Sequence, residues 1–131
     1  SWRKKTEMAK GRASTGLRAH LAGSSAEAQA ARAYEAQGYS VEELRWRGAG
    51  GEIDLILRFG ALLVFAEVKT GPSITAAASR ITPGQMQRVQ ASAALYLEQQ
   101  PLGGLSEARI DVVLVSRDGA VEILENAYGQ G

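Results

Sequence analysis

The sequence contains no cysteine among its 131 residues, which excludes disulfide bonds and thiolate metal sites. Any metal must therefore be held by oxygen ligands or by the single histidine, His20. Long apolar runs are also absent, because the longest one covers only residues 61–66, whereas a membrane-spanning helix needs about 20 such residues. These absences exclude thiol chemistry and predict a protein without a membrane partner.

Charge is nearly balanced overall but unevenly placed along the chain. The formal net charge is +1, yet residues 1–20 hold six bases and one acid, which leaves nine bases and thirteen acids for the remainder. We expect residues 1–22 to form a basic arm suited to contact with a polyanion, a solvated tail being the alternative. The arm lacks the apolar core of a secretory signal, so a cytoplasmic location is expected. Residues 23–127 are long enough for a single domain with its own core.

Hydrophobic periodicity and turn residues predict an α/β protein with elements in the order α-β-β-β-α-β-β. The expected strands cover residues 41–46, 52–58, 61–69, 109–116 and 121–124, with a loop of small residues over 71–79. A hairpin followed by a strand–helix–strand crossover then predicts a mixed sheet of about five strands flanked by helices.

Cap residues define the two expected helices. The first covers residues 26–37, where Ser24 and Glu27 match a capping box, and the second begins at Pro83, is capped by Thr82 and ends before Pro101. The expected buried stripe of the second helix is Met86, Val89, Ala93, Tyr96 and Leu97, with Gln85, Arg88 and Ser92 off that stripe.

Three charged residues interrupt two strands that are otherwise apolar. Asp54 lies in the strand over residues 52–58, and Glu67 and Lys69 lie at the end of the strand over 61–69. A turn centred on residues 60–61 pairs Asp54 with Glu67, with their Cβ atoms about 4.5–5.5 Å apart. Facing carboxylates are destabilising unless a positive charge lies between them. A divalent cation satisfies this condition, and Lys69 lies on the same face.

This pattern is typical of a site that hydrolyses phosphodiesters with Mg²⁺ or Mn²⁺. Mg²⁺ prefers oxygen ligands and keeps several waters, so Asp54, Glu67 and the main-chain carbonyl of Val68 would suffice as protein ligands. Lys69 would orient the attacking water or meet the charge that develops on the phosphate. A structural ion-pair patch at the end of a sheet is the alternative interpretation of the same residues.

Two motifs resemble the signature of the YraN family. They are Gly51-Glu52-Ile53-Asp54-Leu55-Ile56 and Val64-Phe65-Ala66-Glu67-Val68-Lys69-Thr70. The likeness covers roughly residues 23–125, and the family is placed among the restriction-endonuclease-like PD-(D/E)xK proteins with a likeness to Holliday-junction resolvases. The resemblance implies a restriction-endonuclease-like fold in which Asp54, Glu67 and Lys69 are the catalytic and metal-binding set.

The resemblance implies a Mg²⁺-dependent endonuclease that acts on DNA and is selective for branched structures. Such an enzyme is expected to work as a homodimer, because two strands must be cut. A nucleic-acid-binding or interaction module that keeps the nuclease fold without turnover is the alternative. Two departures favour that alternative, since Gly71 follows the Glu67-Val68-Lys69-Thr70 block where the family commonly has arginine, and Gln85 stands where a lysine is frequent.

Other polar residues are candidates for supporting roles. The resemblance implies that Glu27 can join the metal ligands, while the capping box with Ser24 is its alternative role. Glu52 shares a face with Asp54 and would support the site, and Gln85 would keep part of the role of the missing lysine.

Four arginines are candidates for phosphate contacts, although isolated arginines are commonly surface residues. They are Arg45, Arg47, Arg80 and Arg88. Trp46 is expected to be a half-buried strand residue rather than a platform for a base, and Asp111 is expected to pair structurally with Arg109.

Overall fold

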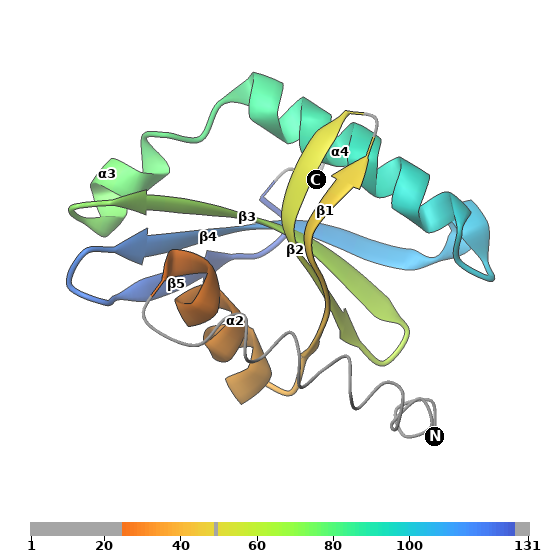
Figure 1. Ribbon diagram of the computed structural model, residues 1–131, viewed down its shortest axis with the longest axis horizontal. Coiled ribbons are helices and arrows are strands. Elements are labelled where there is room, and N and C mark those ends of the chain that lie inside the picture. Colours follow the sequence, from red (N-terminus) through yellow and green to blue (C-terminus); the bar gives the residue numbers. More distant parts are fainter. Residues whose placement is uncertain (1–24, 49, 128–131) are drawn as a thin grey trace.

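The computed structural model describes residues 25–48 and 50–127, which form one mixed α/β fold (Figure 1). The predicted basic arm, residues 1–22, lies outside these described residues. The helices are α2 (Ala26–Ala36), α3 (Ile74–Ala78) and α4 (Pro83–Glu98), with a 3₁₀ turn η2 (Gly103–Leu105). The strands are β1 (Ser40–Gly48), β2 (Gly51–Phe59), β3 (Leu62–Gly71), β4 (Glu107–Ser116) and β5 (Val121–Leu124).

The five strands form one sheet in the order β1-β2-β3-β4-β5. Neighbouring strands are antiparallel except β3 and β4, which run parallel and are joined by the crossover through α3 and α4. The predicted mixed sheet of about five strands is therefore confirmed. None of the helices in the described part of the chain is long and apolar enough to cross a membrane.

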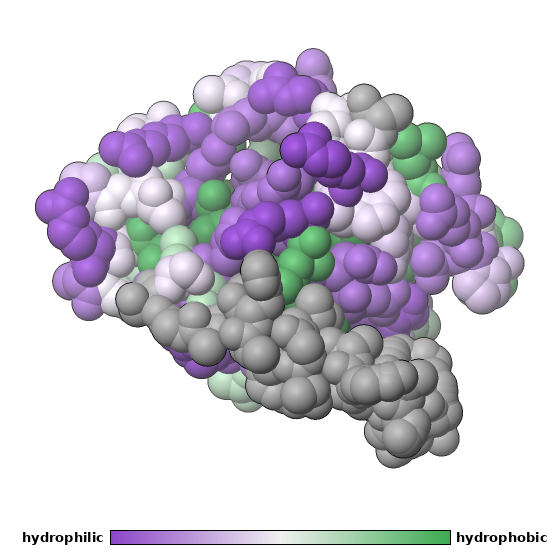
Figure 2. Space-filling view, in the orientation of Figure 1, coloured by the Kyte–Doolittle hydropathy of each residue, from purple (hydrophilic) through white to green (hydrophobic). Residues whose placement is uncertain are grey.

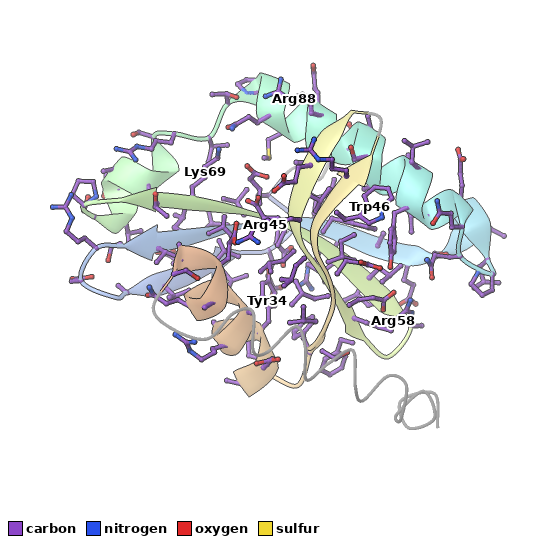
Figure 3. All side chains as sticks on the ribbon, viewed as in Figure 1. Tyr34, Arg45, Trp46, Arg58, Lys69 and Arg88 are labelled. Carbon is purple, nitrogen blue, oxygen red and sulfur yellow. The ribbon has the colours of Figure 1, made fainter. Side chains whose placement is uncertain are left out.

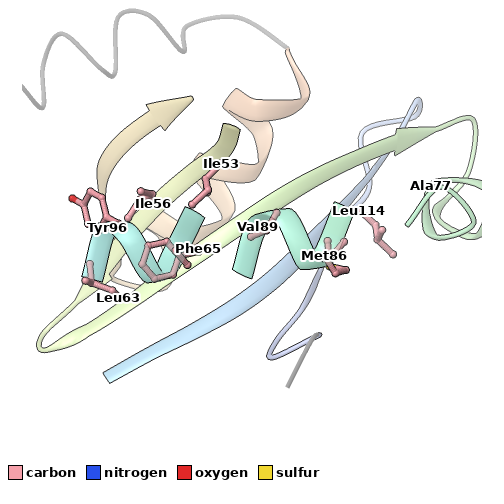
Figure 4. Packing of buried hydrophobic residues seen from close by; sticks show 11 residues of the cluster. Ile53, Ile56, Leu63, Phe65, Ala77, Met86, Val89, Tyr96 and Leu114 are labelled. Carbon is pink, nitrogen blue, oxygen red and sulfur yellow. The ribbon is translucent and has the colours of Figure 1, made fainter. Parts of the chain in front are cut away.

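Helices cover both faces of the sheet and define two cores. On one face α2 packs its small side chains and Tyr34 against Leu55, Leu57 and Val64. On the other face α4 packs Met86, Val89 and Tyr96 against Ile56 and Phe65 (Figure 4). Because alternate residues of β2 and β3 point to opposite faces, each strand supplies both cores, which explains its almost continuous apolar sequence.

Three local expectations are corrected by the structure. The predicted loop over residues 71–79 contains α3, which is capped by Ser73 through a hydrogen bond from the Ala76 N–H. The sequence does not reveal this helix because five residues are too few to show a helical period. Helix α2 is capped by Ser25 rather than Ser24, so Glu27 does not form the predicted capping box. Ser92 is fully buried on α4, although it was expected off the buried stripe.

A buried ion pair ties α2 to β4 on the face away from Glu67 and Lys69. The carboxylate of Asp111 is fully buried and accepts two hydrogen bonds from the Arg109 guanidinium, at 2.8 and 2.9 Å. It also accepts hydrogen bonds from the Tyr34 hydroxyl at 2.7 Å and from the Asn126 N–H at 2.9 Å. Burial and the neighbouring Asp111 raise the pKa of Tyr34 well above its usual value. Asp111 is therefore structural, as predicted.

Replacing Asp111 with alanine should destabilise the fold strongly, by about 3–5 kcal/mol, because it leaves the Arg109 charge and the Tyr34 hydroxyl buried without an acceptor. The free energy of unfolding in urea measures the loss. The exposed strand residue Glu122 provides the control, since Glu122→Gln should leave the unfolding midpoint almost unchanged. An Asp111→Ala midpoint equal to that of the control would contradict the structural role.

Candidate functional site

The register of β2 and β3 brings Asp54 and Glu67 together. Observed pairs run from Phe59 with Leu62 to Leu55 with Ala66, so the ladder ends directly beside Asp54 and Glu67, whose carboxyl groups lie close enough to raise the pKa of Asp54 by repulsion. The predicted register is therefore confirmed over the paired residues. Asp54 is fixed in place because its Oδ2 accepts a hydrogen bond from the Val68 N–H at 2.8 Å.

Lys69 lies two residues beyond Glu67 on the same face of β3. Its Nζ is 3.3 Å from Glu67 Oε2, and the exposed fractions of the two side chains are only 12% and 13%. Water therefore screens this ion pair weakly. One ammonium close to two carboxylates leaves a net negative charge in the site, which Lys69 alone does not balance.

Both carboxyl groups hold their protons more tightly than usual. Burial raises the pKa of Asp54 to about 7, with added repulsion from Glu67, Glu27 and Glu52, against the opposing hydrogen bond from Val68. Burial likewise raises the pKa of Glu67, although the neighbouring Lys69 lowers it in part. The folded chain thus holds these acids close together at a cost, which is typical of a functional site.

A break in strand alternation places Asp54 between the two faces of the sheet. Leu44 on β1 and its partner Leu55 on β2 pack beneath α2, whereas Trp46 and its partner Ile53 pack against the α4 core. The residue between Leu44 and Trp46 is Arg45, with a left-handed φ of 48°. A left-handed residue turns the strand sharply, so the hairpin changes faces at this point. Asp54 lies opposite this turn, where Glu27 from α2 also influences its pKa.

The glycine turn between β1 and β2 is held against α4 by close backbone contact. The fully buried Ser92 hydroxyl donates a hydrogen bond to the Gly51 carbonyl at 2.9 Å. A Cβ at Gly48 would come within 2.7 Å of the Trp46 ring and 2.9 Å of Ser92, and one at Gly50 within 3.1 Å of the Arg88 carbonyl. This contact fixes the start of β2, and with it Glu52 and Asp54, relative to α4.

The resulting cavity combines the acids with polar residues from α4. It has a volume of about 170 Å³ and is lined by Gly51, Glu52, Asp54, Glu67, Gln85, Arg88 and Val89. Arg88 is exposed and makes no ion pair with another described residue. In Figure 3, Lys69, Arg45 and Arg88 lie around the point where β2 crosses β3. Figure 2 shows hydrophilic side chains gathered over the same part of the surface.

The remaining predicted residues lie at or beyond the rim. Arg45 donates a hydrogen bond to Glu27 at 2.6 Å, so the acid proposed to join the metal ligands already has a cationic partner. Arg47 is 78% exposed, and its guanidinium lies 3.8 Å from Glu52. Arg80 donates to the Thr70 carbonyl at 2.9 Å and does not line this cavity.

Trp46 is half-buried and packs edge-on against Tyr96, with 5.1 Å between ring centroids, as predicted. Ser92 and the left-handed Arg45 were not found as positioning residues from the sequence. A serine among the apolar residues of α4 was the only signal available for Ser92, and the sequence carries none for the backbone angle of Arg45.

The oxygen atoms of the site suit a hard cation that takes only a few of its ligands from the protein. Among the described residues, no group of three or more histidine, cysteine or acidic side chains lies close enough to hold a metal. Asp54 and Glu67 therefore offer two carboxylates, and Val68 would add its carbonyl. Mg²⁺ and Mn²⁺ accept such oxygen sets, and Mg²⁺ in particular keeps several waters. The residues present fit this kind of ion because a cation between the two acids would relieve their repulsion.

Comparison with known proteins identifies the class to which this α/β fold with an acidic sheet-end site belongs. Residues 26–115 match the model of a family described as "Uncharacterised protein family UPF0102", which is the YraN family. The chain belongs to this family.

Similar proteins share most of the chain. A UPF0102 protein of Ruegeria sp. (strain TM1040) is 57% identical over 116 residues, which cover 88% of this chain and 94% of the relative. A relative in Roseobacter denitrificans is 49% identical over 120 residues, covering 92% of this chain and 93% of its own length. A third, in Ruegeria pomeroyi, is 48% identical over 119 residues, covering 91% and 97%.

Asp54→Asn should stabilise the metal-free protein at high pH. A carboxyl group whose pKa is raised on folding weakens the fold as pH rises from its unfolded value of 3.8 to its folded value of about 7. The full shift corresponds to about 4 kcal/mol, and partial solvent exposure reduces the expected gain to about 1–3 kcal/mol above pH 7. Thermal unfolding in EDTA between pH 4.5 and 8.5 measures it. The gain should fall to about a quarter of its full value near pH 4.5, whereas a gain independent of pH would argue against the raised pKa.

Gly48→Ala should disturb the contact between the glycine turn and α4. The added Cβ meets the Trp46 ring and Ser92, so we expect a loss of about 1–3 kcal/mol in the free energy of unfolding. Gly104→Ala is the matched control because a Cβ there meets no atom within 4 Å. Equal stabilities of the two variants in urea unfolding would show that the turn is not held tightly against α4.

Proposed function

We propose that the protein is a Mg²⁺- or Mn²⁺-dependent endonuclease that hydrolyses phosphodiester bonds of DNA. One observation carries the proposal. Asp54 and Glu67 are held side by side, burial raises the pKa of both, and Lys69 Nζ lies 3.3 Å from Glu67. A fold that keeps two acids together at a cost in stability gains nothing unless the site has a use. The resemblance to PD-(D/E)xK nucleases supplies that use.

Each residue of the site would have a separate role in hydrolysis. Asp54 and Glu67 would hold the ion, together with the Val68 carbonyl; when bound, the ion supplies positive charge at the phosphate and lowers the pKa of a coordinated water. Lys69 would meet the negative charge that develops on the phosphate and position the attacking water. The exposed Arg88 and the neighbouring Gln85 line the same cavity and would orient the phosphate or its water.

Several features favour branched DNA as the substrate. Aromatic residues make up only 6% of the chain, and the one tryptophan among the described residues, Trp46, packs against Tyr96. Contacts with DNA would therefore be mostly with phosphates, which carry shape rather than sequence information. A symmetric homodimer would present two such sites to the two strands of a junction. An enzyme with this substrate would work in the cytoplasm.

A non-catalytic nucleic-acid-binding module is the second candidate. Two observations favour it. The Lys69 ammonium is already paired with Glu67, and the positions in which the family commonly has arginine and lysine hold Gly71 and Gln85. A site with fewer cations would bind the phosphate less strongly and stabilise the transition state less.

A cleavage assay separates the two candidates. Linear, flapped and four-way DNA are incubated with the purified full chain in Mg²⁺, Mn²⁺ or EDTA, alongside Asp54→Asn, Lys69→Ala and the surface control Glu98→Gln. We expect metal-dependent cleavage, fastest on branched DNA, that falls at least about 100-fold in the two site variants and is unchanged in the control.

Cleavage that survives both site substitutions would indicate a contaminating nuclease and overturn the proposal. Absence of cleavage on every substrate, with DNA binding retained, would establish the binding module instead.

A further inference from the structure

A second concave surface lies on the α2 side of the sheet. Two neighbouring cavities of about 350 and 600 Å³ share Gln29 of α2 and Arg117 of the β4–β5 turn among their lining residues, so they form one continuous groove. Arg80 lines the first cavity, and Arg32 lines the second. We call this surface, defined by Gln29, Arg32, Arg80 and Arg117, the basic groove. Figure 1 shows α2 next to β5 on this side of the sheet.

The three arginines of the basic groove are exposed and lack acidic partners among the described residues. Arg80 donates one hydrogen bond to the Thr70 carbonyl, which leaves most of its guanidinium available to solvent. Among the described residues, Asp118 is the one acid lining either cavity, and its carboxylate accepts hydrogen bonds from the Ser116 hydroxyl and the Ala120 N–H within its own turn. The groove is therefore a site of net positive charge.

The other bases of the described chain have different positions. Arg58 and Arg109 are held in hydrogen-bonded ion pairs with Glu42 and Asp111. Four more lie around the pair Asp54 and Glu67, which we call the acidic site. They are Arg45, Arg47, Lys69 and Arg88. Each of the nine bases outside residues 1–20 thus belongs to one of three groups: the ion pairs inside the fold, the surroundings of the acidic site, or the basic groove. Like charges gathered without partners repel one another, so their grouping favours a polyanionic ligand.

The basic groove and the acidic site of Asp54 and Glu67 share no lining residue, but residues of the two directly adjoin along the chain. Ala26, which lines its first cavity, directly precedes Glu27, and Thr70, which also lines it, directly follows Lys69. Side chains alternate along β3, so Lys69 faces the acidic site while Thr70 faces α2 and the groove. A chain of phosphates passing over the end of β3 would therefore leave the acidic site and enter the groove.

We propose that the basic groove binds the sugar–phosphate backbone of the DNA that flanks the phosphodiester held at Asp54 and Glu67. The choice of DNA as the polyanion rests on the proposed function, whereas the positive charge of the groove and its position beside residues of the site along the chain do not. Arg32, Arg80 and Arg117 each present a planar guanidinium that matches phosphate oxygens. Segment 1–20 of this chain fits poorly as an occupant, because its six bases and one acid would be repelled.

The test is the salt dependence of DNA binding without catalysis. Fluorescence anisotropy of a labelled four-way junction is measured with the full chain in EDTA over 50–200 mM salt, for wild type and for Arg32→Gln/Arg117→Gln. Each lost phosphate contact lowers the slope of log K against log salt by about one, so we expect the double variant to lose about two in slope and bind at least about tenfold more weakly.

Two controls separate local contact from net charge. Arg32→Lys/Arg117→Lys keeps the charge and should retain most of the slope. Leu102→Glu/Leu105→Glu lowers the net charge by the same two units at residues that are 64% and 84% exposed and lie outside the groove, and it should change the slope by less than about half a unit. A groove variant that binds like this second control, or a wild type that does not bind DNA, overturns the proposal.

The outcome is distinguishable from that of the endonuclease assay because binding in EDTA requires no chemistry. Groove-dependent binding without cleavage by any preparation would uphold the groove and overturn the endonuclease. Metal-dependent cleavage with binding unaffected by the groove substitutions would uphold the endonuclease and overturn the groove.

Discussion

Repulsion between Asp54 and Glu67 is the constraint around which the rest of the site is arranged. The β2–β3 register places the two carboxyl groups side by side, and the fold resists their separation because both strands are buried on both faces. Lys69 balances one charge, the Val68 N–H stabilises Asp54, and burial raises the pKa of both acids. An arrangement that costs stability in the metal-free protein is what a cation-binding site requires.

The surrounding structure holds this pair in position from two directions. On one side, Ser92 and the glycine turn fix the start of β2 against α4, which also carries Gln85 and Arg88. On the other side, the left-handed Arg45 turns the β1–β2 hairpin from one sheet face to the other and reaches Glu27 on α2. Asp54 therefore lies where both helical layers approach the sheet.

Much of this could be predicted because it depends on local patterns. The position of the strands along the chain, the β2–β3 register and the Thr82 cap follow from alternation, turn residues and capping chemistry. The short α3 was missed because five residues carry too little periodicity. The predicted cap of α2 was wrong by one residue because Ser24 and Ser25 are equally good caps. The buried role of Ser92 and the backbone angle of Arg45 depend on tertiary contacts between α4, β1 and β2, which no local pattern encodes.

The central claim is that Asp54 and Glu67 form a cation site, and calorimetric titration of Mn²⁺ into the metal-free full chain at pH 8 tests it most directly. The account predicts saturable binding to wild type that is lost or at least about tenfold weaker in Asp54→Asn and in Glu67→Gln, while Glu98→Gln binds like wild type. Equal binding by all four proteins, or no binding by any of them, would contradict it.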